Sequence, residues 1–343
     1  MQSIIGWDIG GAHLKAARLE AGRIVKVVQI ASPLWEGIET LHRAFADAKA
    51  ALGPADLNAV TMTAELADAF QSRDEGVARV AEIAEAELAP HKLVFYAGPA
   101  GMIERKSLAE HARQVASANW HASAAFAARR HPTALFTDMG STTTDLIPIR
   151  GGKVAARGYS DAERMAEGEL VYAGVVRSFL MAGVQLVPFR GRFVPLMNEW
   201  FANMSDVYRI LGELPEDADV MQTADQRDKS VQASMARLAR QIGRDASDAK
   251  PWEWTQLAHV FAEAQLRTII DGAHLLLSHQ QFSTDIPLIG AGVGRFVLKR
   301  LAQRLGFPYV DFGDLFEVTN DARTKAGDCA PACAVALLAL GNH

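Results

Sequence analysis

The sequence predicts an α/β protein built from two related domains. Its 343 residues exceed what one hydrophobic core ordinarily holds, so two domains of common size are expected. A pattern of strand, Asp-x-Gly turn, strand, glycine turn and third strand occurs at Asp8, and it recurs about 130 residues later at Asp138. This interval is far longer than a solenoid repeat, and it therefore indicates a duplicated β-meander followed by helices.

The composition limits the class of partner. A hydrophobic fraction of 49% with 22% charged residues is typical of a globular protein, and a net charge of −5 argues against a coat for nucleic acid or an anionic membrane. A local basic pocket for a small phosphorylated substrate stays compatible with that charge. The longest apolar runs, such as Ala334–Leu340, are too short to span a bilayer, and no secretory leader pattern opens the chain. We expect a cytoplasmic protein, and the sequence leaves its oligomeric state open.

The sequence contains two cysteines, Cys329 and Cys333. Their C-x3-C spacing fits neither a zinc site nor a disulfide framework. On a helix they would share one face, and we expect buried, reduced thiols.

The first domain is expected to span residues 1–130, with the C-terminal helix at 330–343 returning to it. Short apolar runs predict its strands, and apolar residues at helical spacing predict its helices. The expected strands are Ser3–Ile9, Leu14–Glu20, Ile24–Ile30 and Leu93–Ala97, and the expected helices are 36–52, 74–88 and an alanine-rich helix over Ala109–Ala128.

The second domain is expected to span residues 131–329 with helical insertions. Its expected strands are Thr133–Thr137, Thr142–Ile149, one from Val154 onward and Ile286–Ile289; its expected helices surround Val231–Ile242, Trp254–Leu277 and Phe296–Leu305. The polar, acidic stretch Gly212–Arg227 lacks periodicity and is predicted to be a mobile surface loop.

The two Asp-x-Gly turns predict a phosphate site. A glycine-rich turn can direct successive backbone N–H groups at one phosphate because no Cβ blocks the approach. Asp8 and Asp138 would lie beside that phosphate, where carboxylates suit a hydrated Mg²⁺. One such turn alone is more often an ordinary hairpin, whereas two in matching contexts favour phosphate binding. The predicted phosphate-binding residues are Gly10, Gly11, Gly140, Ser141, Thr142 and Thr143.

A third glycine-rich turn, with Gly290, Gly292 and Gly294, follows the strand Ile286–Ile289 and precedes a helix. Such a turn offers close backbone approach and a helix N-terminus to a nucleotide. A dinucleotide-binding fold is the rival interpretation, but the spacing is G-x-G-x-G and too little chain follows for a complete βαβαβ half.

In order along the chain, "GWDIGGAHLKAARL", "LFTDMGSTTTDLIPI" and "PLIGAGVGRF" resemble the two phosphate motifs and the adenosine motif of the actin/Hsp70/sugar-kinase superfamily. "MTAELADAF" and "DCAPACAVALL" resemble its hydantoinase/oxoprolinase-like branch. "TADQRDKSVQASMARLARQIGRD" is similar to proteins of one-carbon pathways linked to tetrahydromethanopterin, whose archaeal relatives are furan-ether synthases of methanofuran biosynthesis. The resemblance covers essentially the whole chain.

This resemblance implies duplicated RNase H-like, actin-like domains facing a central cleft. It also implies a transferase of methanofuran or methylofuran biosynthesis. That enzyme would condense an (aminomethyl)furan-methyl diphosphate with the phenol oxygen of a γ-glutamyl-tyramine or tyrosine-type acceptor and release pyrophosphate. The glycine loops, with Mg²⁺ at Asp8 and Asp138, would stabilise the departing diphosphate.

A base must accept the phenol proton, and three carboxylates are candidates: Glu65, Asp68 and Asp145. Glu65 follows a strand-like segment, although a carboxylate at a helix N-terminus is an equal explanation for it. Lys15 could pair with phosphate or be a solvated edge lysine. We assign no role to His13.

Four further residues are candidate substrate contacts. Arg190 and Arg192 form a basic pair with aromatic neighbours, suited to a carboxylate or phosphate, and a solvated loop is the alternative. Asp161 and Glu169 follow the second meander and could recognise the aminomethyl cation.

Two other functions stay open. One is an ATP-dependent small-molecule kinase or an amide hydrolase of the hydantoinase/oxoprolinase type, although full-length hydantoinases are much longer. The other is a non-enzymatic nucleotide-dependent binding protein, for which the sequence offers no extended peptide-binding domain. Whether the chain binds or uses ATP is open at this point.

Overall fold

The computed structural model describes residues 2–67, 69–280 and 282–341. The chain forms two compact units: the first comprises Met1–Ala134, Ile149–Ala155 and Val310–His343, and the second comprises Leu135–Pro148 and Ala156–Tyr309. The first unit thus takes in residues 310–329, which we expected in the second domain.

The reason for this boundary is a pair of backbone hydrogen bonds. The N–H of Ile24 donates to the carbonyl of Glu317 at 2.9 Å, and the N–H of Thr319 donates to the carbonyl of Ile24 at 3.0 Å. The segment before the last helices therefore lies along a strand of the first unit.

The first unit has a sheet in the order β3-β2-β1-β4-β5-β6. β1 runs antiparallel to β2 and parallel to β4, and β4 is parallel to β5. Its elements are β1 (Ile4–Ile9), β2 (His13–Glu20), β3 (Arg23–Ala31), α1 (Glu39–Leu52), β4 (Leu57–Met62), α2 (Arg73–Leu88), β5 (Lys92–Tyr96), β6 (Met102–Ile103), α3 (Ala112–Val115), α4 (Asn119–Arg130), β9 (Lys153–Val154), α11 (Arg323–Asp328) and α12 (Ala330–Leu340).

The sheet of the second half has the order β10-β8-β7-β13-β14, with β9 also paired to β8. β13 is parallel to the first strand, β7. The elements are β7 (Ala134–Met139), β8 (Thr144–Arg150), α5 (Asp161–Ala166), β10 (Leu170–Val171), α6 (Leu180–Gly183), β11 (Leu186–Phe189), β12 (Arg192–Pro195), α7 (Met204–Ile210), α8 (Val231–Gln241), α9 (Pro251–Gln280), β13 (Leu288–Ala291), α10 (Arg295–Leu305) and β14 (Tyr309–Asp311).

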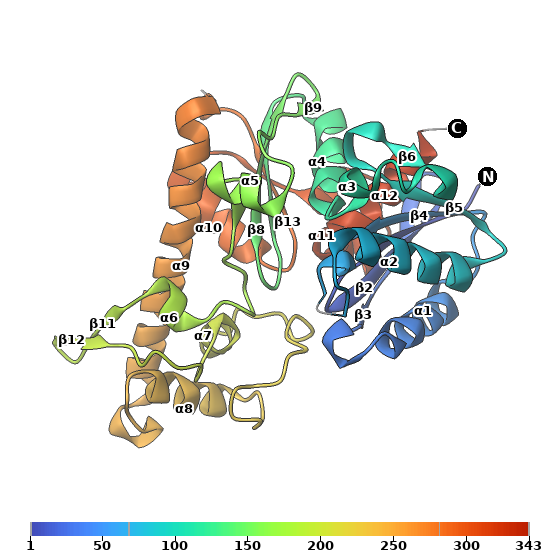
Figure 1. Ribbon diagram of the computed structural model, residues 1–343. Helices are drawn as coiled ribbons and strands as arrows, with labels where there is room; N and C mark the ends of the chain where they lie inside the picture. The colour runs from blue at the N-terminus through green and yellow to red at the C-terminus, as the bar shows by residue number, and fades with distance from the viewer. Residues whose placement is uncertain (1, 68, 281, 342–343) are drawn as a thin grey trace. The chain divides into compact units, whose positions relative to one another are not determined.

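The two sheets share one topology. In each, the first strand is flanked on one side by the second and third strands, and on the other by a fourth and fifth that arrive after helices. Figure 1 labels β2, β3, β4 and β5 of the first sheet and β8 and β13 of the second. This arrangement confirms the predicted α/β fold with duplicated RNase H-like, actin-like domains.

The last helix, α12, forms part of the core of the first unit. Its sequence APACAVALLAL is apolar on every face, and residues Ala330–Ala339 are buried. A helix that is apolar all round must be enclosed. It packs on β1 at Gly6, where an added Cβ would overlap the carbonyl oxygen of Ala332. The apolar stretch near the C-terminus is therefore an internal helix.

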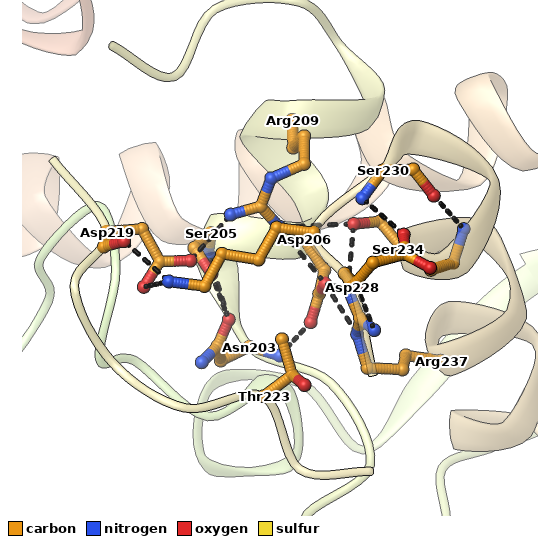
Figure 2. A network of polar contacts seen from close by, with 12 residues as sticks. Asn203, Ser205, Asp206, Arg209, Asp219, Thr223, Asp228, Ser230, Ser234 and Arg237 are labelled. Atoms are coloured by element: carbon orange, nitrogen blue, oxygen red, sulfur yellow. Dashed lines mark hydrogen bonds and ion pairs between the residues drawn. The ribbon is translucent and has the colours of Figure 1, made fainter. Parts of the chain in front are cut away.

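The segment Gly212–Arg227, which we expected to be mobile, is anchored by ion pairs (Figure 2). Arg237 of α8 is 2% exposed and donates to Asp206 at 2.8 Å and to Asp225 of the segment at 3.1 Å. Arg209 of α7 donates to Asp219 at 2.5 Å. Segment 223–245, which carried the resemblance to proteins of one-carbon pathways, thus contributes Asp225 and Arg237 to the ion pairs that hold the loop against α7 and α8.

Replacing Gly6 by Ala tests the packing of α12 on β1. The added methyl group must displace helix backbone, so we expect a loss of about 2–4 kcal/mol in the free energy of unfolding, measured by urea denaturation. Gly11→Ala is the control, because an added Cβ there has nothing within 4 Å. Equal stability of the two variants would contradict this packing.

Replacing Arg237 by Met tests the ion-pair network. Asp206 would lose its nearest charged partner and keep Arg209 at 3.4 Å, and Asp225 would lose its contact with Arg237. We expect a loss of roughly 3–5 kcal/mol in the free energy of unfolding and faster proteolysis within 212–227. Arg240→Met, on an exposed position of the same helix, should change stability by less than about 0.5 kcal/mol. A small effect at Arg237 would show that the loop does not depend on the network.

Candidate functional site

The first glycine turn joins β1 to β2 directly after Asp8. The N–H of Gly10 donates to the carbonyl of His13 at 3.0 Å, and a Cβ on Gly10 would lie 2.9 Å from that carbonyl oxygen. The carbonyls of Gly11 and Ala12 accept backbone bonds from the segment that follows β3. The tight turn therefore needs a glycine at its first position.

The second glycine turn repeats this geometry in the second unit. The N–H of Gly140 donates to the carbonyl of Thr143 at 2.9 Å, the same bond at the matching positions. The carbonyl of Ser141 accepts from the N–H groups of Val176 and Arg177, at 3.0 and 2.8 Å. Ser141, Thr142 and Thr143 are half-buried. Segment 174–177, which the sequence did not single out, thus braces the loop.

The third glycine motif packs against the second turn. Ala291 of β13 pairs with Asp138 of β7. Gly292 has φ +83, and an added Cβ there would overlap the carboxylate of Asp138; one on Gly294 would meet the Met139 side chain. A Cβ on Gly290 would meet the ring of Tyr309. Internal packing therefore explains each of these glycines without a nucleotide.

Asp8 is a buried carboxylate, 4% exposed, on the central strand of its sheet. Burial raises the pKa of Asp8, while the charge of Lys15, its cross-strand partner on β2, and a hydrogen bond from the Asn119 side chain lower it. Within the described part of the chain, Oδ1 of Asp8 has no hydrogen-bond partner. A carboxylate oxygen without a hydrogen-bond partner can coordinate Mg²⁺, which prefers oxygen ligands. Asp8 therefore fits the metal that the fold implies.

Lys15 also reaches the end of α11, just before the last helix. Its Nζ donates to the carbonyl of Asp328 at 3.5 Å, beside Cys329 and Cys333. Both cysteines are free and buried, as expected. Burial raises the pKa of Cys329 to about 12, so this thiol stays protonated at neutral pH.

Glu65 is another buried carboxylate of the first unit, 1% exposed and three residues beyond β4. Burial raises the pKa of Glu65, whereas a hydrogen bond from Ser117 Oγ at 2.7 Å and the charge of Arg73 lower it. Oε2 of Glu65 is buried, with no hydrogen-bond partner among the described residues. Since β1 and β4 are parallel neighbours, Glu65 and Asp8 lie at the same, carboxyl edge of the sheet.

The predicted helix Ala109–Ala128 is wrong as a single helix. The structure has α3 and α4 instead, separated at Ser117, whose φ is +51. The sequence did not assign a role to two residues at this break: Ser117 in the turn, which contacts Glu65, and Asn119 at the start of α4, which contacts Asp8. Serine and asparagine just before a helical run are typical of a helix start, which is the signal that the alanine-rich pattern obscured.

Asp145, another candidate base, is bound by Arg164. The guanidinium of Arg164 donates to its carboxylate, and Arg164 is 2% exposed. Burial raises the pKa of Asp145, and Arg164 lowers it. A carboxylate held in this way suits a structural role. Asp68, the third candidate, lies outside the described residues.

The four candidate substrate contacts do not form one cluster. The carboxylate of Glu169 accepts from the backbone N–H groups of Arg157 and Gly158, at 2.7 and 3.0 Å, and so fixes that turn. Asp161 begins α5. Arg190 makes two hydrogen bonds to Glu253, at 2.7 and 2.8 Å, and Arg192 is exposed on β12.

The hydrogen bonds from Arg190 and from the backbone N–H of Lys250 lower the pKa of Glu253 to about 2. Within residues 2–67, 69–280 and 282–341, no group of three or more His, Cys, Asp or Glu side chains forms a metal cluster. Over the same residues, no helix is long and apolar enough to cross a membrane.

Fold and site together define a duplicated actin-like protein with glycine loops and two buried carboxylates. Residues 56–320, more than half of the chain, match the hydantoinase/oxoprolinase family model, and the chain belongs to this family. A nucleotide-free acetone carboxylase structure aligns with a TM-score of 0.55 at 13% identity over 98% of this chain and 70% of that one, which shows a shared fold alone.

Two curated proteins are more similar in sequence. Both are named (4-{4-[2-(gamma-L-glutamylamino)ethyl]phenoxymethyl}furan-2-yl)methanamine synthase. The protein of Methanocaldococcus jannaschii is 29% identical over 293 residues, covering 84% of this chain and 86% of that protein. The protein of Methanococcus vannielii is 26% identical over 165 residues, covering 48% of this chain and 72% of that protein.

The raised pKa values of Asp8 and Glu65 predict that the contribution of these two groups to stability falls as pH rises. Each has a folded pKa above its unfolded value, so the stability it contributes is present below about pH 4 and is lost as pH rises through the folded pKa. We expect Asp8→Asn and Glu65→Gln to remove this loss and to raise the free energy of unfolding by roughly 0.5–2 kcal/mol at pH 7.

Urea denaturation between pH 4 and pH 8 measures the effect. Glu104→Gln is the control: Glu104 is exposed, and Lys106 lowers its pKa, so this variant should not gain stability as pH rises. A wild type that gains stability relative to both buried-site variants over this range would contradict the prediction.

Proposed function

We propose that this chain is an enzyme of methanofuran-type cofactor biosynthesis that joins a furylmethyl group to a phenol oxygen. The donor would be an (aminomethyl)furan-methyl diphosphate, the acceptor a γ-glutamyl-tyramine or tyrosine-type phenol, and the second product pyrophosphate. The names of the two similar proteins support this, because they describe a furan joined through a methylene group to a phenol oxygen.

The observation that carries the proposal is the pair of buried carboxylates at one edge of the first sheet. Asp8 and Glu65 each have one oxygen with no hydrogen-bond partner in the described part of the chain. A buried polar atom without a partner costs free energy, and such costs are retained where a ligand supplies the partner. Two carboxylates with different neighbours can take different roles.

In the proposed step, the phenol oxygen forms a bond to the furylmethyl carbon. The bond from that carbon to the diphosphate oxygen breaks, and its electron pair leaves with the diphosphate. Glu65 accepts the phenol proton at Oε2. Burial raises the pKa of Glu65, which brings this base closer to the phenol, whose reference pKa is about 10.

The glycine turns would hold the leaving diphosphate through backbone N–H groups, with Lys15 adding a positive charge. Asp8 in the first unit and Asp138 in the second are the candidate ligands for Mg²⁺, which when bound would neutralise charge on the diphosphate. The hydroxyls of Ser141, Thr142 and Thr143 are further candidate donors to phosphate. Arg192 and Asp161 stay as candidate contacts to the remainder of the substrates.

Incubation with the furylmethyl diphosphate, the phenol acceptor and Mg²⁺ tests the function. We expect pyrophosphate and an aryl ether in equal amounts without ATP. An absolute requirement for ATP, with ADP as product, would instead indicate the kinase or amide-hydrolase alternative and would overturn the proposal.

In the same assay, Glu65→Gln should lower kcat by about 10²–10⁴, the usual contribution of a general base, with a small change in KM. Asp8→Asn should lower kcat and also weaken the dependence on Mg²⁺. Glu104→Gln is the matched surface control. Full activity of Glu65→Gln would exclude Glu65 as the base.

A further inference from the structure

Ser117 has a backbone conformation that is rare for a serine. Its φ of +51 lies in the left-handed region, which costs a residue with a Cβ about 1 kcal/mol or more. The helical bonds stop with Ala116, whose N–H donates to Ala112, and resume with Ala122, whose N–H donates to Ala118. The N–H of Ser117 therefore belongs to neither helix.

Both hydrogen-bond donors of Ser117 are directed at Glu65. The hydroxyl donates to Oε1 at 2.7 Å, and the backbone N–H also donates to the carboxylate. These two donors, from one residue 52 positions away in sequence, restrict rotation of the carboxylate. The left-handed turn makes this possible, because it takes the N–H out of the helical ladder.

The backbone of Glu65 is fixed from the opposite side by α2. Gly76 packs so closely there that an added Cβ would lie 2.5 Å from the carbonyl oxygen of Glu65 and 2.7 Å from its Cα. Glu65 thus has a fixed backbone and a fixed carboxylate, and one oxygen, Oε2, is left without a partner in the described part of the chain.

We propose that Ser117 is a positioning residue that holds the Glu65 carboxylate with Oε2 toward the acceptor phenol. This inference rests on the proposed function, in which Glu65 is the base. An unstrained helix through Ser117 would lose both of its hydrogen bonds to Glu65. The strained backbone is therefore retained for these contacts with a buried acid, and such retained strain points to function.

The hydrogen bonds of Ser117 also set the charge of the base. They favour the ionised carboxylate, as does Arg73 at the start of α2, while burial favours the protonated form. Removing the hydroxyl therefore raises the pKa of Glu65, and the acid limb of the activity profile should move to higher pH.

Two substitutions separate the hydroxyl from the backbone strain. Ser117→Gly accepts φ +51 without a Cβ penalty but lacks the hydroxyl, and Ser117→Ala lacks the hydroxyl while keeping the strain. We expect both to lower kcat about tenfold or more, with KM values changed less than about twofold. Ala21→Gly, at an exposed turn with the same φ of 51, is the control and should leave kcat unchanged.

The pH profile distinguishes positioning from a structural role. In Ser117→Gly the acid limb of kcat should move up by about one pH unit, the size expected for a lost hydrogen bond to a charged group. In a Glu65→Gln background, Ser117→Gly should have no further effect on kcat. An unmoved acid limb, or full additivity with Glu65→Gln, would overturn the proposal.

A titration of carboxyl ¹³C signals keeps the test independent of catalysis. Glu65→Gln assigns the Glu65 signal, and Ser117→Gly should shift its midpoint to higher pH. If no ether forms but the midpoint moves, the proposed reaction fails while the contact of Ser117 with Glu65 stands. If ether forms and the midpoint does not move, the positioning role fails alone.

Discussion

The first unit is organised around the burial of two carboxylates at the carboxyl edge of its sheet. Burying charge costs several kcal/mol unless hydrogen bonds or opposite charges compensate. Asp8 has Lys15 across the strand and Asn119 beside it, and Glu65 has Ser117. The turn between α3 and α4 supplies Ser117 to Glu65, and the first residue of α4, Asn119, contacts Asp8. The break between the two helices therefore places a partner beside each carboxylate.

The two copies of the fold have diverged around a shared turn. Gly10 and Gly140 make the same backbone bond, yet Asp8 is buried while Asp138 is half-buried beside Gly292. The duplicated backbone therefore preserves two turns that can direct N–H groups at phosphate. In the first copy, Glu65 adds a second buried acid at the same sheet edge as Asp8. In the proposed reaction, the base therefore lies in the first unit, and each unit contributes one candidate phosphate-binding turn.

Sequence patterns predicted what depends on local periodicity and turn chemistry: the duplicated meander, the two Asp-x-Gly turns and the buried cysteines. They did not predict contacts between distant segments. A helical alanine pattern concealed the break at Ser117, because alanine favours helix on both sides of it. Asp145 is bound by the side chain of Arg164, and Glu169 accepts hydrogen bonds from a backbone turn. The spacing of residues in the sequence does not predict either contact.

The glycine motif at 290–294 shows how a motif can be retained for packing alone. Gly292 permits the approach of Asp138, and Gly290 that of Tyr309, so each would be required even if no nucleotide bound. ATP is then required only if the reaction needs the free energy of ATP hydrolysis. In the proposed reaction, the diphosphate leaving group would carry that driving force, and a stabilised furylmethyl carbon would lower the barrier to its departure. The chemistry of the donor, rather than the presence of the motif, decides whether ATP takes part.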